Sequence, residues 1–177
     1  MRHVLLLRGI NLGPRNRISM PDLRVALERA GLGEARTYLQ SGNVVVSSHA
    51  PAAELSARAR RTIAGGFGLE VDVLVRTRDE LAEIVARDPL GEIADNPKRY
   101  QVSFLERELG AEVLRQLSGL AAASGGFVAI GRELYAWHPD GVARSRLWTR
   151  LAGRQLGVSA TSRNWTTVTK LLAMADA

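Results

Sequence analysis

The sequence predicts an α+β protein made of two tandem halves, each with its strands and helices in the order β-α-β-β-α. Two observations lead to this prediction. Short apolar or alternating segments typical of strands are interspersed with amphipathic segments of helix length, and this series of segments occurs twice along the chain. The order is that of a ferredoxin-like unit, so we expect two ferredoxin-like halves packed together, followed by a C-terminal helix.

The first half is expected to span residues 1–87. Residues 3–8 are mostly apolar and too few for a helix, so they predict a buried strand. Ser19 is placed to cap a helix that has Pro21 in its first turn, and Gly31 is placed to end that helix. The remaining predicted elements are strands at 35–40 and 43–48, a helix from Pro51 to Ile63 ended by Gly65-Gly66, a strand at 71–76, and a helix that Thr77 or Asp79 caps and that ends before Pro89.

The second half is expected to span residues 100–177, after a connecting loop at 88–99 that contains two prolines and a glycine. No repeat of individual residues accompanies the repeated order of elements, so the division rests on that order alone. The predicted elements are a strand at 100–105, a helix at 110–119, hairpin strands at 126–131 and 133–138, a helix at 145–156 and a last helix from Asn164 to Ala175.

The composition excludes several classes of protein. With 177 residues and 46% apolar content, the chain can form one compact domain or two small halves, which argues against disorder. It has no cysteine, which excludes disulfide scaffolds, thiolate metal sites and cysteine nucleophiles. The apolar run Val4-Leu5-Leu6-Leu7 is far shorter than the roughly 20 residues of a membrane span. We therefore expect a soluble cytoplasmic protein with no membrane partner, no metal and no cofactor, and the sequence leaves its oligomeric state open.

The net charge of +6 is unevenly distributed along the chain. Residues 1–48 carry seven arginines against three acids, and residues 144–177 carry six basic residues against one acid, so both ends are basic while the middle is net acidic. Basic ends predict an anionic partner, either a small molecule or a nucleic acid. The alternative is that these arginines are ordinary solvated surface charges, since the chain has 22 Arg and only two Lys.

Three polar clusters are expected to form the walls of one site. The first, residues 8–13, follows the first strand with a cation, two glycines and an asparagine, although its spacing is neither that of a Walker loop nor that of a dinucleotide-binding loop. The second, residues 37–43, lies at a predicted hairpin tip. The third, residues 161–165, is predicted to open the last helix, where free N–H groups and the helix dipole favour anions. The candidate ligand-binding residues are Arg8, Asn11, Ser41, Asn43, Thr161, Arg163 and Asn164.

The leading hypothesis is that these residues bind an anionic small molecule, either a nucleotide or a phosphorylated metabolite. Arg8 and Arg163 would supply positive charge, the three asparagines would supply directional hydrogen bonds, and Ser41 would supply a short polar contact. Each cluster also has a purely structural interpretation, which is a turn for the first two clusters and a helix cap for the third.

Two other functions are kept as alternatives. Arg146, Arg150 and Arg154 recur every four residues on one face of a predicted helix, a pattern typical both of contact with a nucleic-acid backbone and of a solvated face. Ser41 could be the nucleophile of a hydrolase or transferase, but none of the three histidines is well placed to be its base. The aromatic residues of the second half, which could stack on bases, are interpreted as core residues: Tyr100, Phe104, Tyr135 and Trp137.

Four segments carry a resemblance to a known family: residues 8–13, Met20 with the helix after it, residues 37–44 and residues 160–165. They resemble the bacterial domain-of-unknown-function 1697 family, and the resemblance covers essentially the whole chain. It implies an α+β fold with ferredoxin-like halves and brings no established activity with it. One departure is Pro14, which stands where the family usually has a second consecutive glycine. Proline stiffens the loop and removes one N–H donor, which weakens the prediction that the loop holds an anion by its backbone alone.

Overall fold

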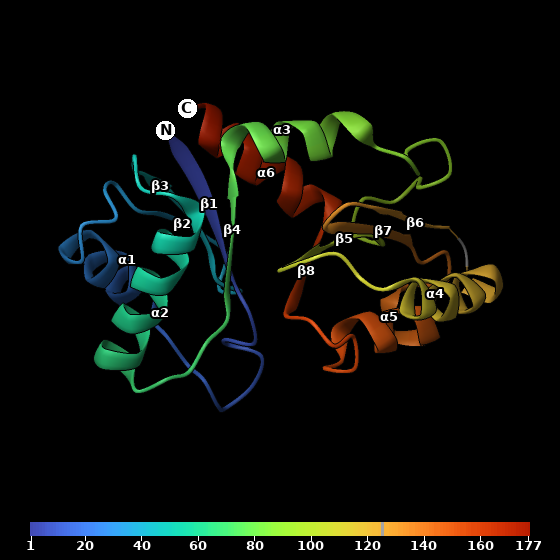
Figure 1. Ribbon diagram of the computed structural model, residues 1–177, viewed down its shortest axis with the longest axis horizontal. Coiled ribbons are helices and arrows are strands. Elements are labelled where there is room, and N and C mark those ends of the chain that lie inside the picture. Colours follow the sequence, from blue (N-terminus) through green and yellow to red (C-terminus); the bar gives the residue numbers. More distant parts are fainter. Residues whose placement is uncertain (125) are drawn as a thin grey trace. The chain divides into compact units, whose positions relative to one another are not determined.

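The computed structural model describes residues 1–124 and 126–177 (Figure 1). These residues form two compact units, one containing Met1–Ala82 together with Lys170–Ala177 and the other containing Glu83–Thr169. Each unit has a four-stranded antiparallel sheet with helices, so the expected α+β class is confirmed. No helix in the described part of the chain is both long and apolar enough to cross a membrane.

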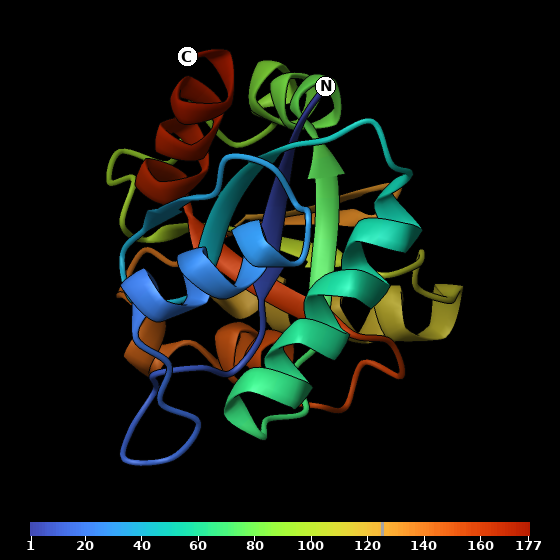
Figure 2. The same ribbon diagram turned by 90° about the vertical axis from the view of Figure 1, so that its left-hand side faces the viewer.

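The first unit contains a four-stranded sheet and two helices that cover one of its faces (Figure 2). The bounds of these elements are β1 Arg2–Leu7, α1 Met20–Arg29, β2 Arg36–Tyr38, β3 Asn43–Ser47, α2 Ala52–Phe67 and β4 Val73–Thr77. The strands lie in the order β2-β3-β1-β4, and each neighbouring pair is antiparallel. Because side chains alternate between the faces of a strand, Leu5 and Leu7 of β1 share a buried apolar cluster with Leu23 of α1 and Leu55 of α2.

The helix starts of the first half follow the expected local chemistry. Ser19 caps α1, since its Oγ accepts a hydrogen bond from the N–H of Asp22 at 3.4 Å. Helix α3, Arg78–Arg87, begins with a reciprocal pair of bonds. Thr77 Oγ1 accepts from the N–H of Glu80 at 3.1 Å, and Glu80 Oε2 accepts from the N–H of Thr77 at 2.8 Å. Of the two caps considered from the sequence, the structure therefore has Thr77.

Helix α2 does not end at Gly65-Gly66, so this prediction is wrong. It continues through both glycines to Phe67 and is ended by Gly68, whose φ of 67° is left-handed. A glycine inside a helix costs about 1 kcal/mol relative to alanine, which the burial of the apolar face of α2 exceeds. Gly68 ends the helix because a residue in the left-handed conformation lets its N–H bond back to the carbonyl of Ala64.

The second unit contains a sheet with the order β6-β7-β5-β8, again with antiparallel neighbours. The bounds of its elements are β5 Tyr100–Leu105, α4 Ala111–Ser124, β6 Phe127–Ile130, β7 Glu133–Trp137, the short 3-10 helix η1 Val142–Arg144, α5 Arg146–Ala152, β8 Ala160–Asn164 and α6 Trp165–Asp176. Figure 1 shows α4 and α5 on one face of this sheet. On that face Leu105 and Leu134 share a buried cluster with Leu117 of α4 and Leu147 of α5. The chain passes from one unit to the other inside α3 and again inside α6.

The second half differs from its prediction in three elements. Helix α4 runs past Gly119 to Ser124, and α5 ends at Ala152, four residues earlier than expected. Residues 160–164 form a strand that the sequence does not predict, and α6 begins only after it. This strand pairs with β5 from Gln101↔Asn164 to Leu105↔Ala160. The pairing with a distant strand, and not a local pattern of apolar residues, sets its conformation.

Candidate functional site

The loop after β1 is held in a defined conformation by its own backbone. The N–H of Arg8 donates to the carbonyl of Asp72 at 2.9 Å, and the N–H of Asn11 donates to the carbonyl of Asn16 at 3.0 Å. Asn11 and Asn16 both have a φ of 54°, a left-handed conformation that asparagine tolerates better than most residues. The loop therefore closes on itself between these two asparagines.

The tip of the β2–β3 hairpin packs against the same loop. Gly42 has a φ of 80°, and its carbonyl accepts a hydrogen bond from the N–H of Leu7 at 2.8 Å. A Cβ at this position would lie 2.6 Å from Leu7 Cβ and 2.9 Å from Ile10 Cδ1, so only glycine allows this close approach. The segments that carry the first and second polar clusters thus lie side by side, and their sharing a ligand site stays a prediction.

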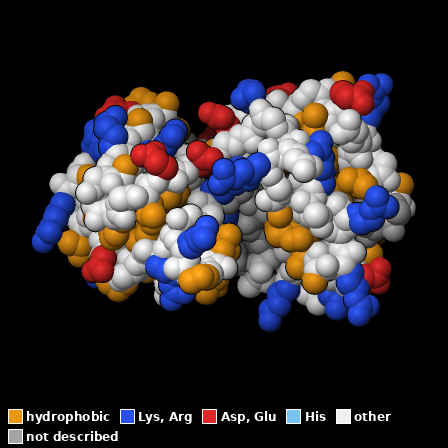
Figure 3. All heavy atoms as spheres, turned by 90° about the horizontal axis from the view of Figure 1, so that it is seen from below, with side chains coloured by type: hydrophobic (Ala, Val, Ile, Leu, Met, Phe, Trp, Pro, Cys, Tyr) orange, Lys and Arg blue, Asp and Glu red, His pale blue; other side chains and the backbone are white. Residues whose placement is uncertain are grey.

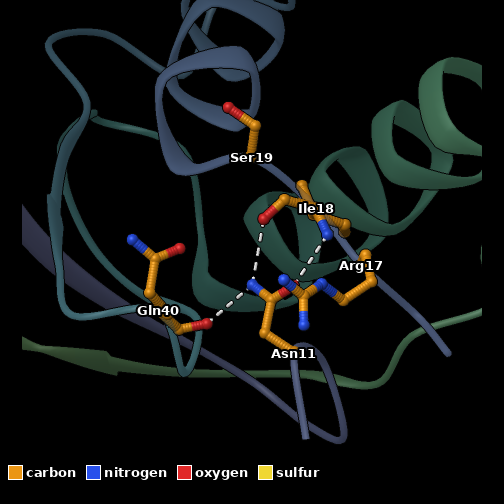
Figure 4. A pocket seen from close by; sticks show the side chains of 5 residues that line it. All are labelled: Asn11, Arg17, Ile18, Ser19 and Gln40. Atoms are coloured by element: carbon orange, nitrogen blue, oxygen red, sulfur yellow. Dashed lines mark hydrogen bonds between the residues drawn. The ribbon is translucent and has the colours of Figure 1, made fainter. Parts of the chain in front are cut away.

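Asn11 links the loop to the hairpin through its side-chain amide (Figure 4). Its Nδ2 donates to the carbonyl of Ile18 at 2.9 Å and to the carbonyl of Gln40 at 2.8 Å, while its Oδ1 accepts from the N–H of Ile18 at 2.9 Å. Both amide hydrogens are therefore used on the protein backbone. These bonds give Asn11 a structural role, and its contact with a ligand stays a prediction.

A pocket of about 460 Å³ lies beside Asn11 and is lined by Asn11, Arg17, Ile18, Ser19 and Gln40. Figure 4 shows Gln40 and Arg17 on opposite sides of Asn11. Among these five residues Arg17 carries the only formal charge, and its Nη1 donates a long hydrogen bond, 3.3 Å, to the carbonyl of Gly13. The pocket wall thus combines a guanidinium, two carboxamides and a hydroxyl without a carboxylate.

Asn43 and Ser41, two of the predicted binding residues, lie next to this region but do not line the pocket. Asn43 is fully buried, and its Nδ2 donates to the carbonyl of Tyr38 at 2.9 Å and to Ser41 Oγ at 3.0 Å. These bonds brace the hairpin tip. Because the amide is a donor in its bond to Ser41, it cannot act there as the general base that a serine nucleophile needs. Arg8 is half-buried and likewise is not part of the pocket wall.

The third predicted cluster belongs to the second unit and lies in β8, not in the first turn of a helix as predicted. Arg163 is buried, and its Nη1 donates to Thr161 Oγ1 at 2.7 Å and to the carbonyl of Ser162 at 2.9 Å. Burial lowers the pKa of the Arg163 guanidinium to about 10, so it stays charged at neutral pH. Asn164 Oδ1 accepts from the N–H of Thr167 at 2.9 Å, which confirms the helix-cap interpretation. That Thr161, Arg163 and Asn164 share a site with the first two clusters stays a prediction.

Comparison with known proteins identifies the family. Residues 1–135 match the sequence model of a family described as a protein of unknown function, DUF1697. The chain belongs to the DUF1697 family. No curated protein matches it. A solved structure, that of the conserved bacterial protein SP0830 from Streptococcus pneumoniae, is 21% identical in sequence and superposes with a TM-score of 0.76, covering 98% of each chain. At this level of identity the likeness shows a shared fold.

In this DUF1697 protein, Arg146, Arg150 and Arg154 do not share one helical face, so that prediction is wrong. Arg154 lies beyond the end of α5, so it does not share a helical face with Arg146 and Arg150. Arg150 donates through Nη1 to Gln155 Oε1 at 2.9 Å and through Nη2 to Gln116 Oε1 at 3.1 Å. The aromatic residues of the second half are buried, which confirms their interpretation as core: Tyr100, Phe104, Tyr135 and Trp137.

Of the five residues that line the DUF1697 pocket, only Asn11 is among the binding residues expected from the sequence. The other four are Arg17, Ile18, Ser19 and Gln40. Backbone conformation marks this region more clearly than residue type. Four non-glycine residues in the described part of the chain have a positive φ, and three of them, Asn11, Asn16 and Leu39, lie in the loop and the hairpin tip around the pocket. Strained conformations of this kind cluster at functional sites. No sequence pattern indicates a left-handed leucine at position 39.

We expect that replacing Asn11 with aspartate will lower the free energy of unfolding by about 2 kcal/mol. The new carboxylate would keep the shape of the side chain but would face the carbonyl oxygens of Ile18 and Gln40 without a hydrogen to donate. Urea denaturation at neutral pH measures the change. Asn16→Asp is the matched control, because Asn16 has the same φ and donates only one long bond, 3.3 Å, to the carbonyl of Gly9. Equal losses in the two variants would contradict the bridging role of Asn11.

Proposed function

We propose that this DUF1697 protein binds a small anionic ligand, a nucleotide or a phosphorylated metabolite, in the pocket beside Asn11. The observation that carries the proposal is the wall of that pocket, where Arg17 is the only charged residue and hydrogen-bonding groups from Ser19 and Gln40 accompany it. A pocket of about 460 Å³ is within the size range of small-molecule sites. A guanidinium with neutral polar groups around it is the chemistry that recognises phosphate esters.

Arg17 supplies the charge in this proposal. It is exposed, and its one described bond to the carbonyl of Gly13 is long, so the guanidinium can turn toward a phosphate at little energetic cost. Ser19 and Gln40 supply hydrogen bonds to the rest of the ligand.

The bonds around the pocket support a preorganised site. Asn11 holds the loop against the hairpin, and Gly42 lets the hairpin approach β1 closely. Neither segment then needs to be ordered when a ligand binds, which saves part of the entropic cost of binding. In this proposal Asn43 and Ser41 stabilise the hairpin that carries Gln40, and the backbone of Arg8 fixes the start of the loop that carries Asn11 and Arg17.

We also propose that each unit is a ferredoxin-like fold and that the protein works in the cytoplasm. The division at the loop 88–99 stays a prediction about the order of elements along the chain, whereas the two compact units change over inside α3 and inside α6. The strand orders β2-β3-β1-β4 and β6-β7-β5-β8, each with two helices inserted between the strands, support the ferredoxin-like fold. The lack of cysteine supports the cytoplasmic location, because secreted proteins often rely on disulfides.

Arg17→Ala is expected to weaken the binding of phosphate esters at least about 10-fold, the effect of losing one charge-assisted contact. Isothermal titration with adenosine 5′-monophosphate, ribose 5-phosphate and glycerol 3-phosphate measures this change. Arg15→Ala is the matched control, since Arg15 is an exposed arginine of the same loop that does not line the pocket. The proposal is overturned if none of the three esters binds to wild-type protein at millimolar concentration, or if both variants bind as wild type does.

The two alternative functions have less support. Figure 3 shows Lys and Arg side chains in several separate places on the face in view, and Arg154 does not share the helical face of Arg146 and Arg150 that a nucleic-acid backbone would follow. The aromatic rings that could stack on bases are buried. For a hydrolase or transferase, the described bond of Ser41 to the Asn43 amide offers no base. We therefore propose neither of these functions.

A further inference from the structure

Two exposed leucines are next in the chain to residues that line the pocket of the proposed function. Leu12 is 81% exposed and Leu39 is 54% exposed. Leu12 follows Asn11 in the chain and Leu39 precedes Gln40, and both of these neighbours line the pocket. The Asn11 Nδ2 bond to the carbonyl of Gln40, 2.8 Å long, holds the two segments together at this point. An apolar side chain therefore stands on each of the two segments that Asn11 joins.

Leu39 contributes little to the stability of the fold in this position. Its φ of 57° is left-handed, a conformation that costs a leucine roughly 1 kcal/mol and that glycine or asparagine adopts more easily. Its side chain is more than half exposed, so it contributes little to burial in the core. A strained backbone that presents an apolar side chain to solvent is a feature of ligand-contacting loops.

We propose that the ligand is a phosphomonoester with an apolar or aromatic substituent, and that Leu12 and Leu39 contact that substituent while Arg17 binds the phosphate. This inference rests on the proposed function and names its ligand class more closely. The combination of one cation in the pocket with exposed leucines next to two of its lining residues in the chain favours it, because small-molecule sites combine few polar groups with apolar ones. Free phosphate or a small polar ester would leave both leucines in water.

Comparing the affinity for phenyl phosphate with the affinity for inorganic phosphate tests the apolar contact separately from the phosphate contact. Phenyl phosphate is expected to bind at least about 10-fold more tightly than inorganic phosphate, because its ring removes apolar surface from water. Arg17→Ala weakens both. The double variant Leu12→Ser, Leu39→Asn weakens phenyl phosphate about 10-fold and leaves inorganic phosphate within about 2-fold. Asparagine is chosen at position 39 because it accepts the left-handed conformation, and an unchanged thermal midpoint shows that the variant folds.

Val25→Thr is the matched control, since Val25 is another exposed apolar residue of the first unit and lies on α1 outside the pocket wall. It should leave both affinities unchanged. Adenosine 5′-monophosphate and octyl phosphate, used as further probes, distinguish a planar base from an alkyl chain as the apolar group. We expect at least one of them to bind wild-type protein more tightly than inorganic phosphate does. In the double variant this difference in affinity should disappear.

The outcomes distinguish a failure of this inference from a failure of the proposed function. If no phosphate probe binds, both are overturned. If inorganic phosphate binds as tightly as every substituted phosphate, and Arg17→Ala weakens it, the proposed function survives and the apolar contact is overturned. The contact is also overturned if the double variant keeps wild-type affinities but changes self-association in sedimentation experiments, since the leucines then belong to a protein interface.

Discussion

Alanine in place of Gly33 is expected to lower the free energy of unfolding by about 3 kcal/mol. Gly33 lies between α1 and β2 with a φ of 74°. A Cβ there would stand 2.0 Å from the carbonyl oxygen of Ser47, the last residue of β3. The left-handed conformation strains any residue with a Cβ, and the clash is with backbone that cannot rotate away. Either the loop or the end of β3 has to move, which disturbs the pairing of β2 with β3.

Urea and thermal denaturation measure this loss, and Gly65→Ala is its matched control. Gly65 is an exposed residue inside α2, and no described atom outside its own helix turn lies within 4 Å of the Cβ it would gain. Alanine favours the helix over glycine by about 1 kcal/mol, so this variant should be more stable than wild type. If Gly33→Ala is instead neutral, the contact with Ser47 does not constrain the loop and the assigned cause is wrong.

Much of the fold is predictable because its elements begin and end at residues that act locally. A serine that caps α1, a threonine that caps α3 and a left-handed glycine after α1 are each recognisable in the sequence. Strand β8 is not, since Ala-Thr-Ser-Arg-Asn has no apolar alternation and its conformation depends on pairing with β5, about 60 residues earlier in the chain. The passage of α2 through Gly65-Gly66 is also not predictable locally, because burial of the apolar helix face outweighs the low helix propensity of glycine.

The sequence predicts where the candidate site lies better than it predicts which residues line it. The polar segments at the end of β1 and at the β2–β3 hairpin lie side by side, because both are at the same end of one sheet. The side chains that line the pocket are set partly by hydrogen bonds from side chains to backbone carbonyls. Asn11 turns its amide onto the carbonyls of Ile18 and Gln40, and Arg17, from the far end of the loop, supplies the charge. These orientations depend on tertiary contacts, which cannot be predicted from residue type alone.

A second large effect is expected from pH, through His138 of the second unit. This histidine follows β7 and is fully buried. Its Nδ1 lies 2.7 Å from Ser145 Oγ, and Ser145 Oγ also accepts from the N–H of Trp148 at 3.0 Å. The serine hydrogen is therefore free to point to Nδ1, which puts the ring hydrogen on Nε2. Nε2 is buried and has no hydrogen-bond partner in the described residues, so a charged imidazolium would be poorly stabilised.

Burial accordingly lowers the pKa of His138 to about 4, from 6.5 for an exposed histidine. Between these two values the unfolded chain binds a proton that the folded protein does not. The stability that this histidine contributes is thus fully present above pH 6.5 and is lost as the pH falls to 4. The pKa difference corresponds to roughly 3 kcal/mol over that range.

Urea denaturation at several pH values between 4 and 7 tests this effect, with His138→Gln as the variant. The side chain of glutamine does not titrate, so the free energy of unfolding of the variant should fall less steeply with decreasing pH, by roughly 3 kcal/mol over the range, whatever its stability at pH 7. His49→Gln is the matched control, because it removes an exposed histidine and should keep the wild-type slope. Identical slopes in all three proteins would mean that His138 takes up its proton in the folded state as easily as in the unfolded one, and that the ring is hydrated or has a partner that the buried geometry does not provide.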